Sequence, residues 1–425
     1  MARKKKEVDL HSTQMCDDNY MKSFKPEALE MTEMSEFLKD IESKQQWLKL
    51  QLVNIGTAVE SGGGLLLEDI KSRYRFYEEP GDDAILSTIE NGKQIGTQPG
   101  AQVFVVTKDI DPRLSLTLLL ADTGLSSLIL RSGVDCSAIS KANILEKKTM
   151  IDIGLKHSGE KETLALYSCG KIRTFNGGNT YAILKQSTMF DGIIKMLQKE
   201  KKKFQFKGGC YSHTRTEATF ELTEGTDEIL ETYKNACKEI KSIKSKGLKV
   251  EYSFTTSDVG EECATISVAL ARGQLKMLLG SPIRVPHNGD NTAEKFVEQL
   301  PLLLAKTKDL VKGLENLINI EIKNPINCML TIAKEAGLSK SQTLASVATF
   351  QTMMDEAAKK KQKVKYSAHD VFYVLQETLM EMRKANVADS TIEKCEENIA
   401  RTLIKEYDWN ERDVAVRPEW STATI

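Results

Sequence analysis

The chain has 425 residues, of which 40% are hydrophobic and 28% are charged. This composition is ordinary for a globular protein and excludes one that is largely disordered. The formal net charge is −1, so any attraction to phosphate groups has to come from local clusters of basic residues and not from the charge of the whole protein.

The cysteines and the N-terminal segment indicate an intracellular protein. Eight cysteines occur singly, without a CxxC pair, which is typical of reduced thiols in the cytosol and does not favour a zinc site. The basic segment Arg3–Lys6 has no apolar stretch behind it, so it does not predict a secretory signal. No apolar run approaches the roughly 20 residues that cross a bilayer. We therefore expect a cytoplasmic protein that does not contact a membrane.

The first 164 residues are expected to form two units. Residues 1–60 are predicted to be a helical segment, because apolar residues recur there at helical spacing. The glycine run at residues 61–64 predicts a boundary. Residues 61–164 are expected to be a strand-rich domain, with buried strands at Val103–Val106 and Leu116–Leu120.

Residues 165–290 are expected to form an α+β core. Helices are predicted over Met189–Gln198 and Thr226–Ile243, where apolar residues gather on one face. The segments expected to be strands are Leu164–Arg173 (with an interrupting turn), Lys203–Lys207, Thr214–Leu222, Lys249–Thr255 and Ala264–Ala271. Turns are predicted at Asn176–Asn179, as a hairpin, and at Gly208-Gly209. Interleaved strands and helices with turns of this type favour an α+β fold with antiparallel strands.

Residues 291–412 are expected to be a separate helical domain. A long helix is predicted over Asn291–Ile318, with a kink or break at Pro301. Capping boxes are predicted where Ser339 precedes Gln342 and where Ser367 precedes Asp370; each marks the start of a helix. A last helix is expected over Ser390–Tyr407, and residues 413–425 are expected to be a loose tail.

The sequence has none of the common catalytic motifs. The strings GxxxxGK[ST], HExxH and GxSxG are all missing. The pair His369-Asp370 is explained by a helix cap, and adjacent carboxylates such as Glu261-Glu262 usually point apart. We therefore expect a protein that is not an enzyme and that uses no cofactor and no metal. A metal-dependent nuclease centre assembled from distant segments, near His213 or His287, stays open as an alternative.

Basic and aromatic residues alternate between residues 195 and 215. One glutamate, Glu200, opposes seven positive residues, which are Lys195, Lys199, Lys201, Lys202, Lys203, Lys207 and Arg215. The rings of Phe204, Phe206 and Tyr211 lie between them. A basic surface neutralises phosphates, and exposed rings stack on bases. The same pattern also fits a solvated helix end followed by a strand whose rings face the core, so both interpretations remain open.

Several short segments of the central region resemble one family of phage and plasmid proteins, catalogued as domain of unknown function nine-three-two. They are Gly170–Arg173, Tyr181–Leu184, Phe190–Ile194, Lys207–Gly209, Thr256–Gly260 and Arg284–Gly289. Asp258 stands where the family usually has glutamate, and Pro286-His287 stands where a cysteine is expected. The resemblance implies a phage or plasmid protein in a bacterial host, with a core similar in outline to single-strand annealing proteins.

Together, the basic stretch and the resemblance predict a cytoplasmic protein, encoded by a phage or plasmid, that binds single-stranded DNA, forms a homo-oligomer and promotes strand annealing in recombination. The residues expected to contact phosphates are Lys171, Arg173, Lys201, Lys202, Lys203, Lys207, Arg215 and Arg284. The candidate stacking residues are Tyr181, Phe204 and Tyr211, and Tyr211 is expected to be the most exposed because it lies beside a turn. His287 completes the predicted interface.

The alternative is a protein-interaction or structural phage protein, such as a virion component or an inhibitor of host defence, that does not bind nucleic acid. The amphipathic helices of residues 291–412 support this alternative, because they are as able to form an interface as an internal core.

Overall fold

The computed structural model describes residues 15, 17–59, 103–107, 117–199, 203–224, 226–239, 247–273, 275–359, 365–404 and 406–416. The predicted boundary at residues 61–64 and the predicted phosphate contacts Lys201 and Lys202 lie outside the described residues.

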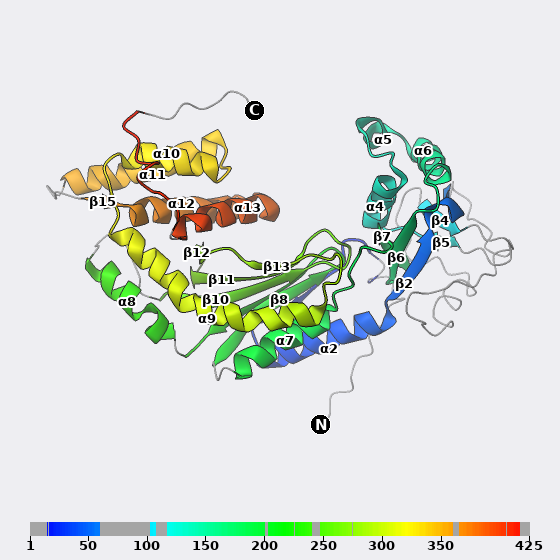
Figure 1. Ribbon diagram of the computed structural model, residues 1–425, viewed down its shortest axis with the longest axis horizontal. Helices are drawn as coiled ribbons and strands as arrows, with labels where there is room; N and C mark the ends of the chain where they lie inside the picture. The colour runs from blue at the N-terminus through cyan, green and yellow to red at the C-terminus, as the bar shows by residue number, and fades with distance from the viewer. Residues whose placement is uncertain are drawn as a thin grey trace.

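The protein has an α+β fold built around an antiparallel sheet (Figure 1). Its strands follow the order β1-β8-β9-β10-β11-β12, and β13 pairs with β11 beside β12. Their bounds are Met21–Phe24 (β1), Phe204–Ser212 (β8), Thr216–Leu222 (β9), Lys249–Thr256 (β10), Ala264–Arg272 (β11), Leu275–Leu278 (β12) and Ile283–Val285 (β13). Four predicted strands of the central region, those over residues 203–207, 214–222, 249–255 and 264–271, are thus confirmed as neighbours in this sheet. The fifth, over residues 164–173, forms strands of the separate sheet β2-β6-β7.

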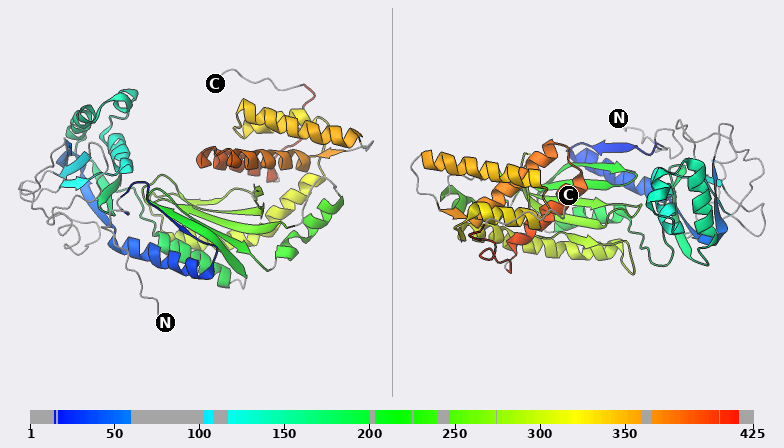
Figure 2. Two further views of the ribbon diagram at one scale, coloured as in Figure 1. Left: turned by 180° about the vertical axis from the view of Figure 1, so that it is seen from behind. Right: turned by 90° about the horizontal axis from the view of Figure 1, so that it is seen from above.

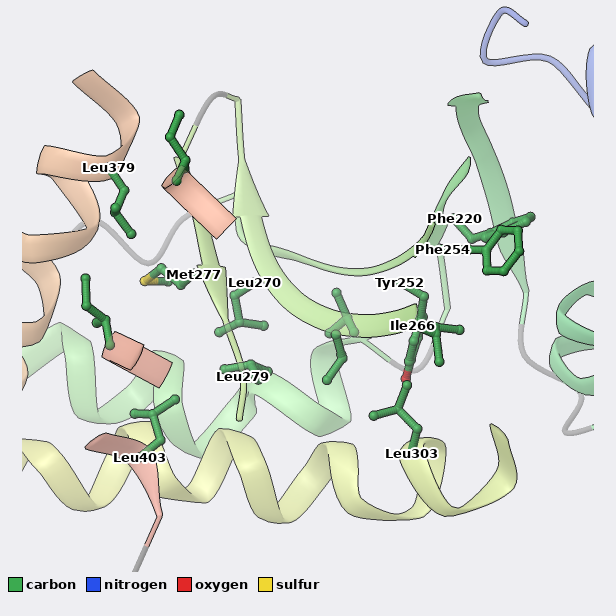
Figure 3. Close-up of a cluster of buried hydrophobic side chains, with 14 of the residues drawn as sticks. Phe220, Tyr252, Phe254, Ile266, Leu270, Met277, Leu279, Leu303, Leu379 and Leu403 are labelled. Carbon is green, nitrogen blue, oxygen red and sulfur yellow. The ribbon is translucent and has the colours of Figure 1, made fainter. Parts of the chain in front are cut away.

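Helices cover one face of this sheet. They are α2 (Ala28–Lys44), α7 (Gln186–Lys199), α8 (Thr226–Glu239) and α9 (Ala293–Ile318). Alternate strand residues point toward them because successive side chains of a strand point to opposite faces. Tyr252 and Ile266 are fully buried on this face, and the Tyr252 hydroxyl lies 3.0 Å from Thr307 Oγ1 of α9. Figure 3 shows Leu303 of α9 facing the same pair of side chains.

The C-terminal helices share the core of the sheet. They are α10 (Pro325–Glu335), α11 (Lys340–Lys359), α12 (Ala368–Lys384) and α13 (Asp389–Ala400), with a 3-10 turn at Arg401–Leu403 and a small β14–β15 ladder (Glu321–Ile322 and Tyr366–Ser367). One cluster of buried side chains runs from the sheet through Leu379 of α12 to Trp409. The hydrophobic core therefore continues across the expected boundary between residues 290 and 291.

A smaller lobe lies at one end of the central sheet (Figure 1). Its elements are β2 (Gln46–Gln51), a 3-10 turn (Leu52–Asn54), β3 (Ile55–Val59), β4 (Val103–Thr107), β5 (Thr117–Leu119), α4 (Asp122–Ser132), α5 (Ser137–Lys141), α6 (Ile144–Lys156), β6 (Glu162–Ser168) and β7 (Lys171–Gly177). The strands form two sheets, β2-β6-β7 and β3-β4-β5. This lobe has its own core, in which Leu128 of α4 and Ile151 of α6 are fully buried.

The expected helical segment over residues 1–60 is confirmed for α2 but is wrong on both sides of it, because Met21–Phe24 form strand β1 and the chain becomes strand β2 at Gln46. Trp47 and Leu48 are both buried and belong to different hydrophobic clusters. Sheet β2-β6-β7 is thus covered on both faces, so its strands do not show the apolar–polar alternation that distinguishes a strand from a helix.

The predicted turn at Gly208-Gly209 is wrong: strand β8 passes through these residues, next to a bulge that shifts the register, and Gly208 has φ +117°. The segment predicted as a hairpin at residues 176–179 does turn, since the backbone N–H of Tyr181 donates to the carbonyl of Gly177 at 3.0 Å, but it does not join two paired strands. The interrupting turn predicted within Leu164–Arg173 is confirmed at Cys169-Gly170, which both have positive φ and form the hairpin between β6 and β7. Glycine pairs occur in bulges as well as in turns, so their presence alone does not locate the reversal.

The predicted capping boxes are confirmed. Ser339 and Gln342 exchange backbone-to-side-chain hydrogen bonds, and so do Ser367 and Asp370 at the start of α12. Residues 413–415, expected to be part of a loose tail, are hydrogen-bonded to the start of α10 and the two residues before it. Asp413 accepts from the backbone N–H of Lys323 and of Asn324, at 2.8 and 2.6 Å.

Candidate binding cleft

A polar cleft of about 990 Å³ lies on the open face of the central sheet. Strands β8 to β13 supply its floor, and α13 with the end of α12 supplies a wall. Figures 1 and 2 show α13 on the side of the sheet opposite α7 and α9. The cleft follows from the alternation of the strands, because the face turned away from the helices carries the polar residues.

Hydroxyl groups line the middle of the floor. Thr219 of β9 and Ser267 of β11 flank Ser253 of β10 in register, and all three are partly exposed. Directly opposed residues in an antiparallel sheet lie about 5 Å apart, so the three hydroxyls form a short row across the strands. Such a row offers both hydrogen-bond donors and acceptors.

Lysines dominate the open face at one end of the cleft, here called the lysine end. Lys207 and Lys276 line the cleft itself, and Lys249, Glu221 and Glu251 lie beside it on β9 and β10. Lys207 Nζ and Lys249 Nζ lie 3.2 and 2.7 Å from the carboxylate oxygens of Glu221. Lys276 Nζ donates to Ser253 Oγ at 3.0 Å. Burial raises the pKa of Glu251. For Glu221 burial acts in the same direction, but the hydrogen bonds from Lys249 and Lys207 outweigh it, and the pKa is lowered.

Carboxylates dominate the other end, here called the carboxylate end. Its acidic residues are Glu217, Glu261, Glu262, Asp389, Glu393, Glu396 and Glu397, and its basic residues are Arg215, Arg284, Arg383 and Lys394. Arg215 lies at the centre: it contacts Glu262 at 3.0 Å, Glu217 at 3.4 Å and Glu393 of α13. Burial, and then the other carboxylates, raise the pKa of Glu262 against the effect of Arg215.

Three arginines connect α13 to its surroundings through glutamates. Arg215 pairs with Glu393, and Arg284 of β13 pairs with Glu397. A third pair joins Arg383, at the end of α12, to Glu396. These ion pairs position the wall of the cleft, and they also mean that the guanidinium groups are already matched by carboxylates.

The two ends are separated along the strands. Glu217 at the carboxylate end and Glu221 at the lysine end are four residues apart on β9. Since a strand rises about 3.3 Å per residue, the ends lie about 13 Å apart, with the hydroxyl row between them.

Lys171 and Arg173 do not lie in the cleft, so their prediction as phosphate contacts is wrong. Their side chains are buried, with residue exposures of 3% and 1%. Both contact Asp18 Oδ1, at 3.0 and 2.7 Å, and Arg173 also donates to the backbone carbonyl of Met15. These cations attach the N-terminal segment to β7, and their position in a buried strand leaves no access for DNA.

The predicted stacking residues are not presented on the open face. Tyr211 is 3% exposed and packs edge-to-face on Phe37 of α2, so the expectation of an exposed ring is wrong. Phe204 packs on Phe220 in the same core. Among the described residues that line the cleft, Phe254 is the one aromatic residue, and its ring is fully buried.

Tyr181 and His287 meet where the sheet β2-β6-β7 borders the central sheet. The Tyr181 ring stacks on His287 with centroids 5.3 Å apart and lies 5.6 Å from Trp47. The Tyr181 hydroxyl donates to the backbone carbonyl of Asp258 at 3.0 Å. Burial lowers the pKa of His287 to about 4, so the ring is neutral at pH 7. Tyr181, His287 and Asp258, from segments far apart in the chain, therefore meet in one internal contact.

Of the predicted interface residues, the cleft brings together Lys207, Arg215 and Arg284. Lys203 forms an exposed ion pair with Glu224. Sequence reasoning missed the opposing carboxylates. Glu393 and Glu397 are four residues apart and share a helix face, but the sequence does not reveal that this face covers a sheet.

The described residues show neither a metal site nor a membrane span. Within them, no group of three or more His, Cys, Asp or Glu side chains is arranged to hold a metal ion. The described helices include none with the length and apolar character to cross a bilayer.

Comparison with known proteins gives no match among family profiles, curated proteins or solved structures.

Proposed function

We propose that this protein works by binding and that its cleft takes an extended polypeptide segment. The observation that supports this most directly is the pairing of cations with carboxylates in the cleft: Arg215 touches three glutamates, and Arg284 touches Glu397. A site of mixed charge suits a partner that carries both signs of charge, as a polypeptide does.

The floor supports the same proposal. Backbone N–H and C=O groups of an extended chain need both acceptors and donors, and the row of Thr219, Ser253 and Ser267 provides them. A single-stranded nucleic acid would instead need free cations and exposed rings. At the carboxylate end, its phosphates would meet seven acidic side chains.

Single-stranded DNA is the second candidate, and the lysine end favours it. Lys207, Lys249 and Lys276 gather on one part of the open face, with Glu221 and Glu251 as the nearby carboxylates. A strand of DNA that contacts this end alone would bind weakly, and its affinity would fall steeply with salt. Strand annealing and assembly into a homo-oligomer belong to this second candidate.

The test is a direct comparison of probes on the full-length protein. A library of short fluorescent peptides of mixed charge and a fluorescent single-stranded oligonucleotide, with its duplex, are titrated at several salt concentrations. We expect peptides from the library to bind and the oligonucleotides to bind weakly or not at all.

A bulky substitution on the floor locates the site. Thr219→Trp fills the middle of the cleft and should weaken peptide binding by about tenfold or more, which corresponds to at least 1.4 kcal/mol. Thr349→Trp, at an exposed position of α11, is the matched control and should bind as the wild type does. Tight oligonucleotide binding that Thr219→Trp abolishes would favour the second candidate, and failure of every peptide to bind would reject the first.

A further inference from the structure

We infer that the cleft selects a segment whose basic and acidic residues are segregated, with about three small polar residues between the two groups. This inference rests on the proposed function, and it names the chemistry of the partner. It follows from the separation of the carboxylate end from the lysine end along the same strands.

The carboxylate end has room for additional positive charge. Its seven carboxylates face four cations, which are Arg215, Arg284, Arg383 and Lys394. Glu261 and Asp389 are exposed and form no ion pair with any other described residue. Arg215 forms ion pairs with three carboxylates. Because they share one guanidinium group, each carboxylate can still accept further hydrogen bonds. A lysine or arginine of the partner would supply the missing donors.

The lysine end has the opposite excess. Three lysines face two glutamates, and Glu221 already contacts both Lys207 and Lys249. Lys276 donates to a neutral hydroxyl, that of Ser253. An ammonium group forms a stronger hydrogen bond with a carboxylate than with a neutral hydroxyl, so Lys276 would gain by binding a carboxylate of the partner. An aspartate or glutamate of the partner therefore suits this end.

The middle of the floor limits what lies between the two charged groups. The hydroxyl row and the glycines Gly208 and Gly209, which follow the bulge in β8, give a surface with short side chains. The ends are about 13 Å apart, which corresponds to about four residue steps of an extended polypeptide, so that about three residues lie between the two charged groups. Small polar residues are expected there, because they let the partner backbone approach the hydroxyls of the floor.

Charge of a single sign does not fit this arrangement. A phosphodiester chain or an acidic peptide pairs with the lysine end but is repelled by the carboxylate end. A basic peptide pairs with the carboxylate end but is repelled by the lysine end. Like charges placed against each other reduce affinity and reject the wrong partner. The segregated pattern satisfies both ends at once.

The experiment compares two fluorescent peptides of identical composition on the full-length protein. One carries two lysines, three serines or glycines and two glutamates in that order, and the other has the same residues with the charges alternating. We expect the segregated peptide to bind roughly tenfold tighter, since the difference comes from a few partly exposed charge pairs. The preference should shrink as salt is raised.

Charge-reversal variants assign the two ends. Glu261→Lys and Lys276→Glu should each weaken the segregated peptide by about threefold to tenfold and leave the alternating peptide nearly unchanged. Lys308→Glu is the matched control, because Lys308 is exposed on α9, which covers the other face of the sheet. Its affinities should equal those of the wild type.

The possible results separate the two proposals. Equal affinity of the two peptides would overturn the inference about segregated charge while leaving a polypeptide-binding cleft in place. If neither peptide binds, and the peptide library does not bind either, both proposals fail.

Discussion

Asp18 is the carboxylate that both Lys171 and Arg173 contact. It lies 3.0 Å from the ammonium group of Lys171 and 2.7 Å from the guanidinium group of Arg173. The side chains of both cations are at most 4% exposed. A charge buried to this extent is costly unless a partner is present, because the interior solvates it poorly.

Removing the Asp18 charge should therefore destabilise the protein strongly. We expect Asp18→Asn to lower the free energy of unfolding by about 3 kcal/mol, since it leaves two buried cations without a carboxylate. Urea unfolding measures this change. Asp17→Asn, at an exposed position next to it, should cost less than about 0.5 kcal/mol. A loss below about 1 kcal/mol for Asp18→Asn would show that water or other groups solvate the two cations.

At the scale of elements, α7 and α9 approach closely at a glycine. A Cβ placed on Gly192 of α7 would lie 2.3 Å from Cγ2 of Val297 of α9. Both helices pack under the central sheet, so neither can move away without disturbing other contacts. The small residue at this position is explained by the helix–helix contact and not by backbone conformation.

Gly192→Ala should consequently destabilise the protein, although alanine favours a helix by about 1 kcal/mol. Overpacking in a core costs about 1–3 kcal/mol, so we expect a net loss of about 1 kcal/mol. Adding Val297→Ala removes the clash, and the double variant should be more stable than the sum of the single effects predicts. Urea unfolding of the four proteins gives this coupling. Additive effects would mean that the helices shift apart freely.

The sequence predicted the elements whose environment is simple. Strands β9, β10 and β11 and helices α7 and α9 are apolar on one side, so their periodicity identified them. Strand β2 is buried on both sides, and its pattern resembled a helix. The site was harder to predict, because its partners are distant in the chain. Arg215 and Glu393 are 178 residues apart, so the positive residues were visible while the carboxylates that pair with them were not.

At the scale of the whole molecule, the buried side chains of the described residues form two large clusters. One joins the central sheet to its covering helices and to the C-terminal helices α10–α13. The other fills the lobe of β2–β7 and is built around α4 and α6. A third, small cluster around Trp47, with Tyr181 packed against it, lies between the other two. Because residues that share a core lose their packing together, the clusters define the units that unfold cooperatively.

Native-state hydrogen exchange of two core variants tests this division. Leu379 of α12 is fully buried in the first cluster and Ile151 of α6 in the second. Leu379→Ala should cost about 2–5 kcal/mol and should lower the protection of amides in α12 and in strands β10 and β11 by the same amount. Ile151→Ala should lower the protection of β6 and β7 instead. If Leu379→Ala affected only the amides of α10–α13, the C-terminal helices would unfold as a domain of their own, and the wall of the cleft could detach from its floor.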